Sequence, residues 1–145
     1  MEFKVGMYIR TLSNLIKKRI DHLSKETGLT GFQGYLIGYL IAETVRRDVF
    51  QRDVEKHLEI SRASVTSVLQ LLEKNGFIRR ESVLDDARLK KIVVTEKGVR
   101  ADAQIKATLD DLEVSLREGI SQEEFEIFQS VMQRIKMNLD TLEKQ

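Results

Sequence analysis

Apolar residues recur every three or four positions near the start of the chain, which predicts an amphipathic first helix. Its apolar stripe consists of Val5, Ile9, Leu12, Ile16, Ile20 and Leu23. Gly28 is suited to end this helix, because glycine readily adopts the left-handed conformation of a helix C-terminus. A second helix is predicted to begin at Thr30, since Thr30 and Gln33 have the spacing of a capping box.

Glycines within the second predicted helix lower its helix propensity, by about 1 kcal/mol each relative to alanine. Gly34 and Gly38 are four residues apart and therefore lie on one helix face. This spacing fits either a close crossing with another helix or a helix that is weak by itself. The pattern alone does not separate the two.

Two short helices joined by a tight turn are predicted in the middle of the chain. The first spans residues 51–58, with Val54 and Leu58 directed inward, and Ile60 is expected to fill the turn that follows. The second begins after Ser61, a favourable capping residue, and ends before Gly76.

The second of these helices has two distinct faces. One is an apolar stripe that we expect in the core, formed by Val65, Val68, Leu69 and Leu72. The opposite face has small hydroxyls, an amide and an alanine instead of the Glu and Lys that are typical of a merely solvated face. Such side chains can approach a major groove closely and offer hydrogen bonds to base edges and phosphates. We therefore expect DNA contacts from Ser61, Arg62, Ala63, Ser64, Thr66, Ser67 and Gln70.

A β-hairpin is predicted next, with strands over residues 77–83 and 91–94. The connection over residues 84–90 is charged and longer than a tight hairpin turn, so we expect a projecting loop. Thr95 is expected to cap the following helix. The apolar seam of that helix consists of Ile105, Leu109, Leu112 and Leu116, and Gly119 ends it.

The last predicted helix opens with a capping box formed by Ser121 and Glu124. Its apolar residues alternate at spacings of three and four, and an isolated helix cannot bury such a seam. The seam either packs within the monomer or forms a subunit interface. We favour the interface, because the first helix and the last two flank the compact middle of the chain. The predicted interface residues are Phe125, Phe128, Met132, Ile135, Leu139 and Leu142.

The distribution of charge along the chain supports the predicted DNA-contacting region. The 145 residues suffice for one domain or one compact unit with an appendage, and the net charge is only +1. Residues 46–100 nevertheless hold 13 Lys and Arg against 9 Asp and Glu, whereas residues 101–145 hold 5 against 10. The basic excess coincides with the two short helices and the hairpin, as expected of a surface that meets phosphate.

The absence of cysteine excludes disulfides, thiolate metal sites and thiol redox sensing. No stretch approaches the roughly 20 apolar residues that span a bilayer, so we expect a cytoplasmic protein without a membrane partner.

The sequence gives little support to an enzyme. It contains no glycine-rich phosphate loop, no nucleophile elbow and no cluster at metal-ligand spacing, so neither a cofactor nor a metal is expected. His22 and His57 are expected to be structural or solvated. Core packing is favoured over a ligand pocket for Tyr8, Tyr35 and Tyr39. The main alternative to a DNA-binding protein is a helical adaptor that uses its terminal seam to bind another protein, without specific DNA binding.

Three stretches of the sequence occur in a distinctive combination. They are residues 60–66 with 72–78, the motif Asp86-Ala87-Arg88 followed by Lys90 and Lys91, and the junction Val94-Thr95-Glu96-Lys97-Gly98. Together they resemble the MarR family of winged helix-turn-helix transcription regulators, and the likeness spans essentially the whole chain. The Asp-x-Arg motif leading into Thr-Glu-Lys-Gly is the most distinctive part. The chain has no cysteine near its N-terminus and so does not resemble the peroxide-sensing branch.

The resemblance implies a mainly α-helical (α+β) fold. Residues 29–100 would form the winged helix-turn-helix DNA-binding domain, and residues 1–28 and 101–145 would be dimerisation helices that entwine in a homodimer. The recognition helix would enter the major groove of double-stranded DNA. Arg88 would enter the adjacent minor groove, steadied by a charge-assisted contact from Asp86, with Lys90 as a further DNA contact.

The function implied is that of a sequence-specific transcription regulator, a repressor, that binds a palindromic operator. Family likeness also implies release from DNA by a small, often aromatic or phenolic anion, bound near the junction of the dimer helices and the DNA-binding lobe. A repressor that responds to no ligand is the alternative. No motif in the sequence identifies the residues of such a pocket.

Overall fold

The computed structural model describes residues 2–143. The chain divides into two compact units between Leu109 and Asp110, and each is described by itself. None of the described helices combines the length and the apolar character needed to cross a lipid bilayer.

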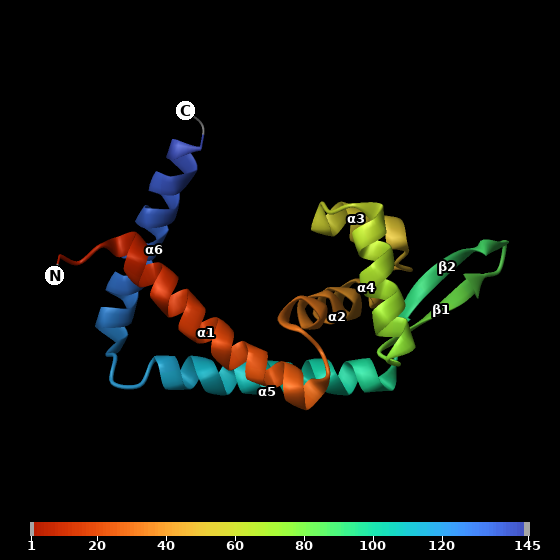
Figure 1. The fold of residues 1–145 in the computed structure, drawn as a ribbon, viewed down its shortest axis with the longest axis horizontal. Helices are drawn as coiled ribbons and strands as arrows, with labels where there is room; N and C mark the ends of the chain where they lie inside the picture. The colour runs from red at the N-terminus through yellow and green to blue at the C-terminus, as the bar shows by residue number, and fades with distance from the viewer. Residues whose placement is uncertain (1, 144–145) are drawn as a thin grey trace. The chain divides into compact units, whose positions relative to one another are not determined.

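The first unit contains five helices or parts of helices and one hairpin (Figure 1). Its elements are α1 (Val5–Thr27), α2 (Gly31–Thr44), α3 (Gln51–Leu58), α4 (Arg62–Lys74), β1 (Ile78–Val83), β2 (Asp86–Val94) and the start of α5 (Glu96–Leu116). The antiparallel strands β1 and β2 project beyond α4 as a wing. The expected fold class, a mainly helical α+β protein with a winged helix-turn-helix, is confirmed.

Local capping signals place the helix ends as predicted. Gly28 ends α1 in the left-handed conformation, with φ 75°. At the start of α2, the Gln33 backbone N–H donates to Thr30 Oγ1 (3.1 Å), and the Thr30 backbone N–H donates to Gln33 Oε1 (3.0 Å). Thr95 caps α5 by accepting a hydrogen bond from the backbone N–H of Gly98 (3.2 Å). These bonds satisfy amide groups that a helix end otherwise leaves without partners.

The core of the first unit is a single apolar cluster. It contains the predicted stripe of α4 as Val65, Leu69 and Leu72, with Val68 partly buried against it. The remaining buried apolar residues are Leu29, Leu36, Ile37, Leu40, Val49, Val54, Phe77, Ile78, Ile92 and Ala101. The expectation that Ile60 fills the turn between α3 and α4 is wrong, because 37% of its surface remains exposed.

The glycines of α2 mark a close crossing with α5, which resolves the alternative left open by the sequence. A Cβ atom on Gly34 would lie 3.0 Å from Ile105 Cδ1, and one on Gly38 would lie 3.2 Å from Asp102 Oδ1. Both distances are shorter than ordinary carbon contacts. Glycine therefore lets the two helices approach each other.

The wing has a shorter turn than predicted. Strand β2 begins at Asp86, so the turn consists of Leu84 and Asp85 alone, and the expected loop over residues 84–90 is wrong. The predicted DNA-contacting residues Asp86, Arg88 and Lys90 consequently lie on a strand.

An irregular register explains this difference. Ser82 pairs with Lys90, whereas the next residue, Val83, pairs with Asp86. The extra residues on β2 form a bulge that interrupts regular alternation of the two strand faces. A strand with this irregularity does not give the period-2 pattern by which strands are recognised in a sequence.

The second unit contains the end of α5 and α6 (Gln122–Leu142). The predicted capping box is present: the Glu124 backbone N–H donates to Ser121 Oγ (3.2 Å), and the Ser121 backbone N–H donates to Glu124 Oε2 (2.8 Å). No residue of α6 is buried, and the exposed members of its apolar seam are Phe128, Leu139 and Leu142.

Candidate nucleic-acid interface and adjacent pocket

The small polar face of α4, opposite its apolar stripe, begins at the helix cap. Ser61 Oγ accepts a hydrogen bond from the backbone N–H of Ser64 (3.1 Å), and the two hydroxyl oxygens lie 2.9 Å apart. The predicted DNA-contacting residues Ser61, Arg62, Ala63, Ser64, Ser67 and Gln70 are all exposed. The Arg62 guanidinium lies 3.9 Å from Glu55 but keeps 86% of its side chain exposed, so it remains available to a phosphate.

Thr66 differs from the other predicted contacts. It is half-buried, and its Oγ1 accepts a hydrogen bond from Gln51 Nε2 of α3 (2.8 Å). Its hydroxyl therefore lies where α3 meets the polar face of α4.

Arg88 is fixed through its backbone and leaves its charge free. The Asp86 carboxylate accepts a hydrogen bond from the Arg88 backbone N–H (2.9 Å). Within residues 2–143, no carboxylate lies within 4.0 Å of the Arg88 guanidinium. A cation on a projecting strand without a protein counterion is suited to a phosphate backbone.

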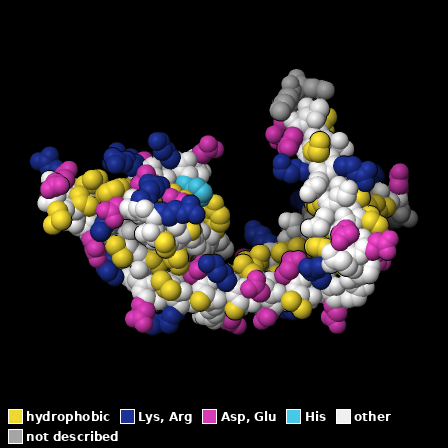
Figure 2. Space-filling model, turned by 180° about the vertical axis from the view of Figure 1, so that it is seen from behind, with side chains coloured by type: hydrophobic (Ala, Val, Ile, Leu, Met, Phe, Trp, Pro, Cys, Tyr) yellow, Lys and Arg dark blue, Asp and Glu magenta, His cyan; other side chains and the backbone are white. Residues whose placement is uncertain are grey.

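Most other basic residues of the wing are paired within the protein. The ion pairs are Arg79–Glu81 (2.8 Å), Arg80–Glu73 (3.3 Å) and Lys91–Asp48 (3.3 Å). Lys90 differs because its ammonium donates to the neutral Ser82 hydroxyl (2.6 Å), so its charge is not cancelled there. Figure 2 shows Lys and Arg side chains at the tip of the wing and along one edge of the lobe that carries it.

An ionic corner holds the start of α3. Asp53 accepts a hydrogen bond from the Phe50 backbone N–H (2.8 Å) and pairs with Arg47 (3.0 Å), which also contacts Glu43 (3.1 Å). Burial acts to raise the pKa of Asp53, but the Phe50 hydrogen bond and Arg47 outweigh it and lower that pKa. Burial, followed by the Glu43 charge, raises the pKa of neighbouring Tyr39.

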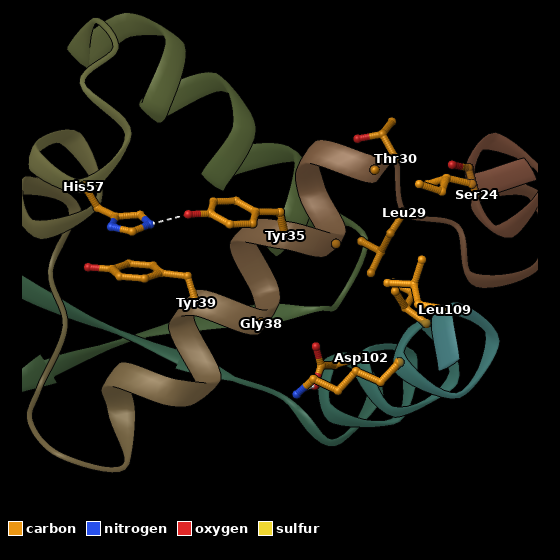
Figure 3. A pocket seen from close by; sticks show the side chains of 14 residues that line it. Ser24, Leu29, Thr30, Tyr35, Gly38, Tyr39, His57, Asp102 and Leu109 are labelled. Carbon is orange, nitrogen blue, oxygen red and sulfur yellow. Dashed lines mark hydrogen bonds and ion pairs between the residues drawn. The ribbon is translucent and has the colours of Figure 1, made fainter. Parts of the chain in front are cut away.

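A cavity of about 480 Å³ lies beside this corner within the first unit, and α1, α2, α3 and α5 line it (Figure 3). Its aromatic side is formed by Tyr35, Tyr39 and His57. The Tyr35 hydroxyl and His57 Nε2 lie 2.7 Å apart, and the Tyr39 and His57 rings stack with centroids 3.8 Å apart and planes 8° apart.

Asp102 provides the acidic group of this cavity. Its side chain is 9% exposed, and it pairs with the ammonium of Lys106 (2.7 Å), whose side chain is 63% exposed. Gly38 lies on α2 close to this carboxylate (Figure 3), and a Cβ atom on it would be 3.2 Å from Asp102 Oδ1. Among residues 2–143, no group of three or more His, Asp or Glu side chains is arranged to hold a metal ion.

The sequence did not anticipate this pocket. Tyr35 is 56% exposed and Tyr8 is also exposed, so the expected core packing is wrong for both, whereas Tyr39 does pack against the core. The available signal was the spacing of Tyr35 and Tyr39, which places both rings on one face of α2. His57 is exposed as expected, but it also joins these two rings.

Comparison with known proteins agrees with this geometry. A family model described as MarR family matches residues 27–89, from the end of α1 into the wing. MepR, a transcription regulator of the Staphylococcus aureus multidrug efflux pump MepA, shares 26% identity over 94% of this chain and 99% of its own, with a TM-score of 0.80. An S. aureus MepR–DNA complex is similar at 26% identity, 92% and 98% coverage, and a TM-score of 0.78. The transcription regulator MarR from Oenococcus oeni PSU-1 is similar at 26% identity, 92% and 99% coverage, and a TM-score of 0.61. Over residues 27–89 the chain is similar to the MarR family of winged-helix transcription regulators, and these solved regulators share its fold.

Proposed function

We propose that this regulator binds a palindromic operator in double-stranded DNA as a homodimer and represses transcription there. The observation that carries the proposal is the combination, on one lobe, of a small polar face on α4 with the unpaired Arg88 of the wing. The face of α4 enters the major groove, where base edges differ in their donors and acceptors. Arg88 enters the neighbouring minor groove, and Lys90 contacts a phosphate.

The homodimer is supported by the apolar seam of α6. Leu139 is 58% exposed in the single chain, although it belongs to a seam sustained along the whole helix. A second copy would cover this surface. We propose residues 1–28 and 101–145 as the dimerisation helices and residues 29–100 as the DNA-binding domain. A two-fold dimer presents two recognition helices, which is why its operator should be palindromic.

Selection of bound duplexes from a random library tests this proposal. We expect an inverted repeat with half-sites about one helical turn apart, roughly 10 bp from centre to centre. Binding should persist in excess random-sequence competitor DNA. Selection that enriches no palindrome would contradict the proposal. If excess competitor DNA abolished binding to every selected duplex, the helical adaptor would be favoured.

We further propose that the cavity beside α2 binds a small aromatic ligand that releases the protein from DNA. The cavity reaches His57 on α3, so an occupant contacts the helix-turn-helix directly. A ligand shifts DNA affinity only if it binds the two conformations of the lobe unequally. Asp102 favours a positively charged group on this ligand, because the exposed Lys106 can move aside whereas the buried carboxylate cannot.

Three matched probes test the ligand proposal: an aryl trimethylammonium, its uncharged tert-butyl isostere and the corresponding aryl carboxylate. We expect the cation to bind most tightly and to weaken operator binding, with the carboxylate weakest. Asp102→Asn should remove the preference for the cation while leaving binding of the neutral probe intact. Equal binding of all three probes to the unchanged protein would contradict the assigned ligand charge.

A further inference from the structure

Thr66 is unusual among the threonines within the helices of this protein. Several others donate their hydroxyl proton to the backbone carbonyl four residues earlier, an arrangement common in helices. These are Thr11 (3.0 Å), Thr44 (2.7 Å), Thr108 (3.0 Å) and Thr141 (2.9 Å). The Thr66 hydroxyl instead faces the side-chain amide of Gln51, 2.8 Å away.

Glu55 fixes the orientation of that amide. The same Gln51 Nε2 lies 3.2 Å from Glu55 Oε1, one turn further along α3. An ionised carboxylate can only accept hydrogen bonds, so the amide nitrogen and not the amide oxygen must face it. With its two N–H groups, Gln51 therefore donates both to Glu55 and to Thr66.

The consequence for Thr66 is a hydroxyl donor that lacks a partner. Its oxygen already accepts from Gln51, and its own proton has no protein acceptor among residues 2–143. A hydroxyl can ordinarily serve a base as donor or as acceptor. Thr66 Oγ1 keeps a second lone pair, but the group that still lacks a partner is the O–H donor, so a base that offers an acceptor is favoured.

We propose that Gln51 is a positioning residue for sequence recognition: it holds Thr66 as a hydrogen-bond donor, so that Thr66 selects an acceptor at the base edge. This inference rests on the proposed entry of α4 into the major groove. Guanine, thymine and the N7 atom of adenine present acceptors there, whereas cytosine presents the N4 amino donor. Thr66 should therefore reject cytosine at the position that it faces.

The expected discrimination is roughly tenfold, because two opposed donors leave a desolvated group without a partner. It should be confined to one position of each half-site. The position is identified with Thr66→Val, which removes the hydroxyl at nearly constant shape and should abolish the preference there. Thr66→Ser keeps the hydroxyl beside Gln51 and should retain it.

The decisive variant is Gln51→Met, which keeps the length of the side chain but cannot donate. The Thr66 hydroxyl is then free to turn, as the other helix threonines do, and to present its oxygen to the DNA. Selection from a random duplex library should show the depletion of cytosine falling from roughly tenfold to less than about twofold. Gln51→Glu should reverse the polarity, since a carboxylate accepts the Thr66 proton, and should enrich cytosine or adenine at that position. Gln104→Met, the same substitution on an exposed part of α5, is the matched control and should change nothing.

The outcomes separate this inference from the proposed function. If the unaltered protein enriches no operator, both fail. If it enriches an operator but Gln51→Met keeps the depletion of cytosine, or alters preference across the whole half-site, the positioning role is wrong and the proposed function stands. We expect Gln51→Met to reduce the depletion of cytosine only at the position that Thr66 faces. In a protein that already carries Thr66→Val, Gln51→Met should cause no further change there.

Discussion

Arg88 and Lys90 differ from the other cations of the wing because neither of them pairs with a carboxylate of the described residues 2–143. Arg79, Arg80 and Lys91 each face a carboxylate, so much of their field is cancelled before any ligand arrives. Surface ion pairs contribute little to stability. Their main effect here is that they limit the positive charge of the wing to the cations that remain unpaired. The charge available to DNA is thereby concentrated on β2.

Replacement of Arg88 by alanine should weaken binding to many DNA sequences together. In the proposed minor-groove position the arginine would sense groove shape and phosphate charge more than base identity, so the ranking of sequences should persist. The slope of log K against log salt should become less steep by about 1, as expected for the loss of one phosphate contact. Gel shifts or fluorescence anisotropy at several salt concentrations measure both quantities.

Arg79→Ala is the matched control, because Arg79 lies on the same wing but pairs with Glu81. It should change the salt slope much less. An Arg88→Ala protein that retained full affinity and the original slope would show that the wing does not meet DNA as proposed.

Some properties of single residues followed from the sequence and others did not. The burial of Val65, Leu69 and Leu72 was predictable, because helical period alone assigns them to one face. The partner of Thr66 was not predictable, since Gln51 comes from a different helix and only the packing of α3 on α4 brings the two together. Ile60 was misassigned for a related reason: an apolar residue in a turn is buried only if a neighbour covers it.

At the scale of elements, helix ends were predicted best because their signals are local. The two capping boxes and the glycine that ends α1 each lie within a few residues of the end that they define. The strand boundary of β2 was missed because it depends on pairing with β1 through a shifted register. The pocket was missed because four helices contribute its walls.

The junction between the wing and α5 should tolerate no side chain at Gly98. A Cβ atom there would overlap the carbonyl oxygen of Phe77 and would lie 2.6 Å from Val94 Cγ1. That carbonyl cannot easily move, because it accepts a hydrogen bond from the Thr95 backbone N–H (3.0 Å). Gly98→Ala should therefore lower the free energy of unfolding by about 2 to 3 kcal/mol, as measured by urea denaturation at fixed protein concentration.

Gly6→Ala provides the comparison within the same chain. Gly6 also lies in a helix, but no atom stands within 4 Å of the position that a Cβ would take. Alanine should leave stability unchanged or raise it by up to about 1 kcal/mol, through its better helix propensity. Equal stabilisation by both substitutions would mean that the packing of the wing on α5 is looser than described.

At the scale of the whole molecule, the sequence predicts a homodimer, whereas the structure describes a single chain. The seam of α6 has the spacing of a packed helix, yet no residue of that helix is buried within the single chain. Sequence pattern could identify the apolar seam because its period is local, but the partner that we propose to cover it is a second copy of the chain. The proposed homodimer would bury this seam against a second copy of the chain.

Ile135→Asp or Leu139→Asp should convert the protein to monomers and abolish operator binding. A carboxylate left unpaired at the centre of an apolar interface costs several kcal/mol, enough to dissociate a dimer of modest affinity. Binding should be lost because a monomer presents one recognition helix to a two-part operator. Sedimentation velocity gives the assembly state, and circular dichroism shows whether the helices remain folded.

Asn138→Asp is the appropriate control, since it adds the same charge beside Leu139 at a position outside the seam. It should remain dimeric and bind the operator. If both seam variants also sediment as intact dimers, the seam cannot be the interface and must instead be covered within one chain. If they become monomers that still bind the palindrome with full affinity, dimerisation exists but is not what couples the two half-sites.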